Sequence, residues 1–111
     1  MRINTQDYNG VTVIDMQGDL DVDSVEQLRT SAVDNVARSR AGLVLDMKAV
    51  GFIASKGLEQ LLWLRDYCNE NKCELRLAGL DENCLKILEI TRLASEFDCY
   101  AELAEAVKSF A

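Results

Sequence analysis

Residues 43–62, LVLDMKAVGFIASKGLEQLL, contain the change of pattern that decides the fold. The stretch starts with an apolar run that Asp46 ends, which is typical of a buried strand. A short apolar patch follows, and a long helical pattern then starts at Ser55. A buried strand therefore leads through a loop into a helix whose N-terminus lies at Ser55. Unpaired N–H groups and a partial positive charge make such a helix end a natural position for binding or phosphorylation.

Strand and helix patterns alternate along the rest of the chain. Asn9-Gly10 is a strong hairpin signal, and Asp23 or Ser24 is expected to begin the first helix. The predicted strands span residues 2–8, 11–16, 43–47, 74–78 and 97–100, and the predicted helices span residues 23–38, 55–71, 82–91 and 101–110. Helices that connect successive strands favour a parallel sheet, to which the hairpin adds an antiparallel edge.

The sequence thus predicts an α/β fold in one domain spanning residues 1–111. We expect a mixed, mostly parallel sheet of four to five strands with four helices, in the order β-β-α-β-α-β-α-β-α. Gly42 is expected to form a left-handed turn after Ser39, Arg40 and Ala41 end the first helix. Helical spacing also predicts a buried side for each helix. These residues are Val25, Leu28, Ala32 and Val36; Leu58, Leu61, Leu62, Leu64 and Cys68; Leu85 and Leu88, with Ile87 as a further candidate; and Leu103, Ala106, Val107 and Phe110.

The charge balance disfavours nucleic acid and anionic membranes as partners. The chain has 12 basic and 19 acidic residues, a net charge of −7, and no run of basic residues. Nucleic acid and anionic membranes both bind proteins through clusters of Lys and Arg. No apolar run reaches the roughly 18 to 20 residues that a membrane span needs. The first residues contain no apolar segment of the kind found in signal peptides, so we expect a cytoplasmic protein.

The residue types disfavour enzyme and metal chemistry. The chain has no His, and its four cysteines, at positions 68, 73, 84 and 99, form no CxxC pair. Zinc ligands at the usual spacing and a Ser-His-Asp or Cys-His pair are therefore missing. We expect no cofactor, no metal and no enzyme activity. The cysteines are interpreted as small core residues, with a redox switch as the alternative. A closed pocket lined by Asp19, Asp21 and Ser55 would favour an enzyme or small-ligand binder instead.

Several motifs together resemble the STAS family, named for sulfate transporters and anti-sigma factor antagonists. Residues 18–21, GDLD, followed by a helix, resemble the family's G-x-L-D opening. Residues 43–58 resemble its central motif, which is close to V-L-D-L-S-x-V-x-F-I-D-S-S-G-L. Residues 87–93 resemble the late L-x-L-T-G-L element, and residues 101–107 resemble the closing helix. The match covers nearly the whole chain, with its motifs in the family's order.

The resemblance implies a bacterial signal-transduction protein that regulates transcription through protein–protein contacts. Anti-anti-sigma members bind an anti-sigma kinase, which phosphorylates a Ser at the start of the second helix and thereby separates the two proteins. A phosphate brings roughly −1.5 to −2 charge into such an interface. Here the family's D-S-S-G reads Ala54-Ser55-Lys56-Gly57, so Lys56 stands where the acceptor Ser is usual. We therefore predict that the usual switch is absent, and Ser55 is the remaining candidate for phosphorylation.

Lys56 has two interpretations. A Lys in the first helical turn opposes the helix dipole, at a cost of roughly 0.3–1 kcal/mol. It is either a tolerated exposed residue in a member that lost regulation or a contact to an acidic partner surface.

A candidate partner-binding line runs along the same helix. Lys56, Gln60, Trp63 and Tyr67 share one outward line at 3.6 residues per turn, opposite the apolar stripe. Exposed Trp and Tyr favour a protein interface. The alternative is that Trp63 packs on a neighbouring helix or on a second copy of the chain. Asp19 and Asp21 join this candidate site if their loop lies nearby, although turn formation and helix capping explain these acids more simply.

The leading hypothesis is non-enzymatic binding of an anti-sigma factor or a related kinase-like ATPase. The alternative, which also follows from the resemblance, is an accessory STAS subunit of a lipid or anion transporter or of a stress-signalling assembly. Neither role requires nucleic acid or membrane insertion.

Overall fold

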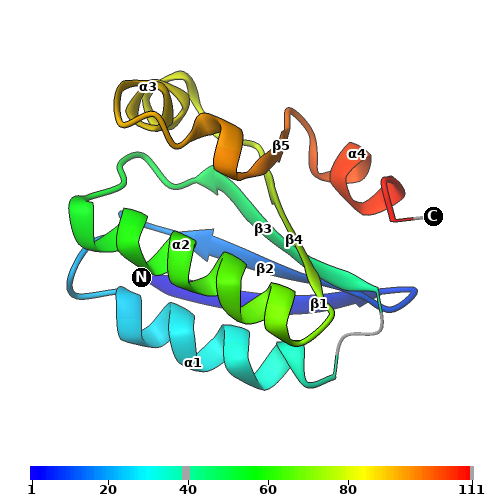
Figure 1. Cartoon of the computed structure of the whole chain (residues 1–111). Helices are drawn as coiled ribbons and strands as arrows, with labels where there is room; N and C mark the ends of the chain where they lie inside the picture. Colours follow the sequence, from blue (N-terminus) through cyan, green and yellow to red (C-terminus); the bar gives the residue numbers. More distant parts are fainter. Residues whose placement is uncertain (39–40, 111) are drawn as a thin grey trace.

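The computed structural model describes residues 1–38 and 41–110 and confirms the predicted order of elements (Figure 1). The strands are β1 (Arg2–Tyr8), β2 (Val11–Gln17), β3 (Gly42–Ala49), β4 (Glu74–Ala78) and β5 (Asp98–Tyr100). The helices are α1 (Val25–Val36), α2 (Ser55–Glu70), α3 (Glu82–Ile90) and α4 (Leu103–Lys108), with a short 3₁₀ turn at Ala94–Glu96. In the described residues these elements form the expected α/β fold.

The five strands form one mixed sheet in the order β1-β2-β3-β4-β5. β1 runs antiparallel to β2, and every later pair is parallel. The predicted hairpin joins β1 to β2, with Asn9 at φ 54° and Gly10 at φ 92°. Positive φ at both central residues is what a two-residue turn needs to match the twist of the strands.

Alternating side chains of the central strands separate two cores. α1 and α2 lie side by side on one face of the sheet, and α4 lies on the other (Figure 1). Leu43, Leu45 and Met47 of β3 point into the larger core with α1 and α2, to which α3 adds Leu88. Val44 belongs to the smaller core under α4. Because the first part of β3 is buried on both faces, residues 42–45 form a continuous apolar run.

Gly42 does not form the predicted turn. It is the first residue of β3, and a Cβ atom there would lie 2.1 Å from Cε1 of Phe110. The absent side chain therefore makes room for the aromatic ring that anchors the end of α4 to the sheet. α1 ends at Val36, and the predicted helix end at Ser39 and Arg40 lies outside the described residues.

α3 presents a different face to the core from the one predicted. Asp81 caps the helix, and its Oδ1 accepts a hydrogen bond of 2.8 Å from the N–H of Cys84. Cys84 and Leu88 point inward, one turn apart, whereas Leu85 is 42% exposed. The prediction for Leu85 was wrong because the small thiol of Cys84 fills the inner position. Within residues 1–38 and 41–110, no helix combines the length and apolar character that a membrane crossing requires.

The packing predicts unequal effects of the same substitution in two helices. Leu64→Ala in α2 should lower the free energy of unfolding by roughly 2–5 kcal/mol, because Leu64 is fully buried against the sheet. Leu85→Ala should change it by less than about 0.5 kcal/mol. Urea denaturation followed by circular dichroism measures both values. Equal losses in the two variants would contradict the surface position of Leu85.

Candidate functional site

Two loops meet at the N-terminus of α2. The N–H of Leu20 donates to the carbonyl oxygen of Phe52 at 3.0 Å, and the N–H of Ala54 donates to the carbonyl oxygen of Leu20 at 2.9 Å. Leu20 and Ile53 form an isolated parallel bridge, and both side chains are buried. The loop after β2 is therefore fixed to the loop after β3, and Asp19 and Asp21 lie on either side of the bridging residue.

Gly57 sets how closely α2 approaches this loop pair. A Cβ atom at position 57 would lie 2.5 Å from the carbonyl oxygen of Leu20 and 2.9 Å from its Cγ. Real Cβ atoms do not come that close to backbone, so any side chain would push the helix away from the loop. Gly51, in the second loop, is exposed, and a Cβ there would lie 3.8 Å from Oδ1 of Asp19. Asp19 is therefore close to the backbone at Gly51.

The acids of the first loop take part in local turn structure. Ser24 is the N-cap of α1 and is buried; its hydroxyl donates to the carbonyl oxygen of Asp19 at 3.0 Å and accepts from the N–H of Asp21 at 3.0 Å. Oδ1 of Asp21 accepts from the N–H of Asp23 at 3.0 Å. Turn formation thus accounts for the carboxylate of Asp21. Asp19 contributes its carbonyl group to the turn and has an exposed side chain.

Ser55 and Lys56 are exposed at the start of α2. Ala54 is the N-cap, so no side chain caps the helix, and Ser55 is its first residue. The side chain of Lys56 is 65% exposed, and its Nζ lies 3.2 Å from Oε2 of Glu59, one turn along the helix. An exposed pair of this kind contributes little to stability. It leaves the cation on the surface, where a partner can reach it.

The predicted outward line along α2 is wrong for two of its members. Gln60 is 5% exposed, and its Nε2 has no hydrogen-bond partner. Trp63 is half-buried, with the guanidinium of Arg29 from α1 lying 4.2 Å from its ring centre. Tyr67 stacks on Trp63 with ring centres 5.0 Å apart. α1 packs along α2 and widens its buried surface beyond one stripe, which confirms the alternative that Trp63 packs on a neighbouring helix.

The structure also exposes two apolar residues at this end of the molecule. Val22 is 63% exposed in the first loop, and Phe52 is 47% exposed in the second. Phe52 belongs to the apolar patch at residues 50–53 of the sequence. A short apolar patch is normally interpreted as part of the core, so the sequence did not predict that Phe52 is exposed. We define the α2 N-terminal surface by five exposed residues from the two loops and the first helical turn. Its members are Asp19, Val22, Phe52, Ser55 and Lys56.

The N-terminus of α3 supports this surface from the third side. Nδ2 of Asn83 donates to the carbonyl oxygen of Gly51 at 2.8 Å, and the thiol of Cys84 donates to the carbonyl oxygen of Val50 at 3.3 Å. Burial raises the pKa of the Cys84 thiol to about 12, and the charges of Asp81 and Asp19 add to the effect. Cys84 is therefore a neutral structural donor at neutral pH.

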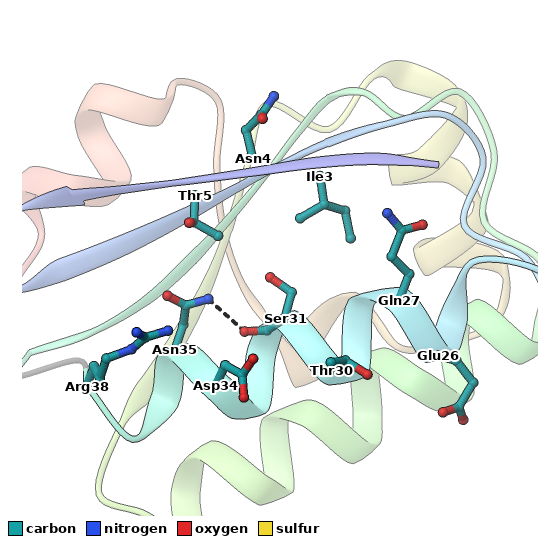
Figure 2. Close-up of a pocket in the computed structure, with 10 residues that line it drawn as sticks. All are labelled: Ile3, Asn4, Thr5, Glu26, Gln27, Thr30, Ser31, Asp34, Asn35 and Arg38. Atoms are coloured by element: carbon teal, nitrogen blue, oxygen red, sulfur yellow. Dashed lines mark hydrogen bonds between the residues drawn. The ribbon is translucent and has the colours of Figure 1, made fainter.

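A separate groove runs between β1 and α1 (Figure 2). Ile3 and Thr5 of β1 face residues of α1 such as Ser31 and Asn35 across it, and Nδ2 of Asn35 donates to the carbonyl oxygen of Ser31 at 2.7 Å. Its volume is about 810 Å³, and its walls carry polar side chains. Asp19, Asp21 and Ser55 are not among the residues that line it. In the described part of the chain, no cluster of three or more His, Cys, Asp or Glu side chains could hold a metal ion.

Comparison with known proteins places the chain in a family. The family model for the STAS domain matches residues 2–106. The chain belongs to the STAS domain family. The anti-sigma-F factor antagonist RsfB of Mycobacterium tuberculosis is 34% identical to this STAS domain over 59 residues, which cover 53% of the chain and 48% of that relative. The STAS domain thus spans about half the length of the curated relatives it matches.

Solved structures share the fold. An anti-sigma factor antagonist from Mycobacterium paratuberculosis superposes with a TM-score of 0.87 at 24% identity, covering 98% of this chain and 92% of that one. A sulfate transporter family protein from Wolinella succinogenes gives a TM-score of 0.82 at 16% identity, covering 92% and 85%. At these identities the likeness concerns the fold, which therefore serves proteins of both kinds.

The close contact at Gly57 makes a testable prediction. Gly57→Ala should lower the free energy of unfolding by about 1–2 kcal/mol, because crowding of the Leu20 carbonyl outweighs the gain in helix propensity of roughly 1 kcal/mol. Gly51→Ala is the matched control, since its Cβ would meet ordinary contacts and should change stability by less than about 0.5 kcal/mol. Guanidinium denaturation measures both variants. A Gly57→Ala protein at least as stable as wild type would show that α2 is not seated against Leu20.

Proposed function

We propose that this STAS domain acts by binding a regulatory protein, an anti-sigma factor or a related kinase-like ATPase, through its α2 N-terminal surface. Two facts support the proposal: the chain is a member of the STAS family, and its curated relative RsfB is named as an anti-sigma-F factor antagonist. The observation that carries the choice of surface is the exposure of Phe52, a large aromatic residue held by backbone hydrogen bonds beside the start of α2.

The chemistry of the surface suits a protein partner. Aromatic side chains are favoured at the centres of interfaces, and charged groups are favoured at their rims. Phe52 and Val22 supply apolar contact area, while Lys56 and Asp19 supply opposite charges around it. The partner is expected to offer an apolar pocket for Phe52 and a carboxylate for Lys56. Binding of this kind needs no catalytic group, in agreement with a non-enzymatic role.

The contact line predicted along α2 from the sequence is accordingly shortened. Gln60 and Trp63 are packed against the protein itself, and Tyr67 stacks on Trp63. These three residues are proposed to hold α2 in place, whereas Ser55 and Lys56 remain proposed contacts. Asp21 is proposed to shape its loop, since Oδ1 accepts the N–H of Asp23.

We propose that Lys56 makes partner binding independent of phosphorylation at this position. An exposed hydroxyl at this position could receive a phosphate and bring negative charge into the interface, whereas the Lys56 ammonium carries a fixed positive charge. Regulation of this STAS domain would then act through its abundance or through its partner.

Exchange of one apolar residue tests the surface. In a pull-down from extract of the source cells, wild type should retain a kinase-like ATPase or anti-sigma factor. Phe52→Asp should lower the retained amount at least tenfold, which corresponds to a loss of roughly 1.4 kcal/mol in binding free energy. Ile90→Asp is the control, because Ile90 is 72% exposed on α3 and the charge change is the same. Quantitative mass spectrometry of the retained proteins measures the effect.

The possible results separate the hypotheses. Equal retention by Phe52→Asp and wild type would place the interface elsewhere. A transporter or a scaffold in place of the ATPase would favour the accessory-subunit role.

Lys56→Ser tests the proposed loss of the switch. With ATP and the purified partner kinase, wild type should remain unmodified, while Lys56→Ser should take up phosphate and release the partner, because the phosphate adds negative charge to the interface. Intact-mass measurement and gel filtration report the two effects. Stoichiometric phosphate on Ser55 of wild type would show instead that the switch had moved by one residue.

A further inference from the structure

The C-terminal end of α2 brings two thiols together. Lys72 has a left-handed backbone with φ 57°, and its N–H donates to the carbonyl oxygen of Asn69 at 3.3 Å. The N–H of Cys73 donates to the carbonyl oxygen of Cys68 at 2.9 Å. These two bonds define a Schellman motif, which frequently brings the side chains of the third residue before the C-cap and the second residue after it into contact. Here those residues are Cys68 and Cys73.

The C-terminus of α3 provides an internal comparison. The backbone of Arg92 has a left-handed conformation with φ 62°. Its N–H donates to the carbonyl oxygen of Glu89 at 3.1 Å, and the N–H of Leu93 donates to the carbonyl oxygen of Leu88 at 2.8 Å. The equivalent contact pair there is Leu88 and Leu93, which are ordinary apolar residues packed in the main core. The same motif in α2 therefore needs two apolar side chains, and the chain supplies two cysteines in their place.

The two thiols are unequal. Both are free and buried: Cys68 is fully buried, and Cys73 is 4% exposed. The hydrogen bond from the Cys68 thiol lowers the pKa of Cys73, although burial and the charge of Glu74 oppose the shift. The same hydrogen bond, together with burial, raises the pKa of Cys68. The lower pKa of Cys73 and its slightly greater exposure favour it over Cys68 as the attacking sulfur.

We propose that Cys68 and Cys73 form a redox-modification site, at which a peroxide converts two buried thiols into an intramolecular disulfide. The Cys73 thiolate attacks one oxygen of hydrogen peroxide, the O–O bond breaks, and Cys73 becomes a sulfenic acid while hydroxide leaves and takes up a proton. The Cys68 sulfur then attacks the sulfenic sulfur and water leaves. In total, two thiols and one peroxide give one disulfide and two waters.

The geometry favours an intramolecular product. A disulfide requires Cα atoms within roughly 7 Å, and the backbone hydrogen bond between the same two residues favours that separation. Burial hinders a second protein molecule from reaching either sulfur, and Cys73, at 4% exposed, is the less buried of the two toward a small peroxide. Cys99 is exposed, but burial of part of its thiol and the charge of Asp98 raise its pKa. The proposal does not depend on the proposed function.

Peptide mapping after peroxide treatment tests the site. The folded protein is treated with hydrogen peroxide, unfolded, labelled with N-ethylmaleimide and digested with trypsin without reduction. Each cysteine lies on its own tryptic peptide, because Lys72 separates Cys68 from Cys73. The expected result is two labelled thiols instead of four, and a disulfide joining the peptides 66–72 and 73–76. Dithiothreitol should restore all four labels.

Variants assign the roles of the two sulfurs. Cys68→Ser, which keeps a hydrogen-bond donor beside Cys73 but cannot form a disulfide, should leave Cys73 as a sulfenic acid that dimedone traps, whereas Cys73→Ala should leave Cys68 unreacted. Cys84→Ala and Cys99→Ala should form the disulfide as wild type does, and circular dichroism checks the fold of each variant. The proposal is overturned if all four thiols of wild type remain free. A disulfide involving Cys84, Cys99 or a second chain would overturn it as well.

Discussion

The contact between Gly57 and the carbonyl of Leu20 fixes the position of α2, and the rest of the site depends on it. Leu20 bonds to the second loop in both directions, through its N–H and its carbonyl oxygen. The helix can follow the loop at once because position 57 has no Cβ. Parallel strands direct their loops to the same edge of the sheet, so the loops after β2 and β3 and the start of α3 converge there. One close backbone contact therefore determines where Phe52, Ser55 and Lys56 are presented.

The sequence was sufficient for the elements and their order because their patterns are local. The Asn9-Gly10 sequence indicates a hairpin turn, and the apolar run at residues 42–45 indicates a buried strand. Errors arose where a distant element decides the outcome. Gly42 is explained by Phe110, which lies far along the chain, and its turn propensity was misleading for that reason. The error at Leu85 is of another kind, because its immediate neighbour Cys84 fills the inner position of α3.

The candidate site was predicted in part, and its error has the same origin. Helical period correctly placed Lys56 on the surface but also placed Gln60 and Trp63 there. The helical periodicity of a sequence predicts one buried stripe, whereas α2 packs on both the sheet and α1. The direction of the second packing partner cannot be read from the helix itself, because it depends on the sheet order and the side on which α1 crosses over. The exposure of Phe52 required the loop conformation, which backbone bonds to Leu20 determine.

The two ends of α2 carry different chemistry on one rigid element. The helix has 16 residues and is about 24 Å long, so its ends cannot interact directly through side chains. A covalent bond between Cys68 and Cys73 would fix the last turn of α2 to the start of β4, which is already held in the sheet. At the other end, Gly57 leaves little space for displacement toward Leu20. The close seating at Gly57 and the pairing of β4 in the sheet therefore hold α2 at both ends, so the proposed thiol pair and the proposed binding surface lie on one helix that is fixed at two points.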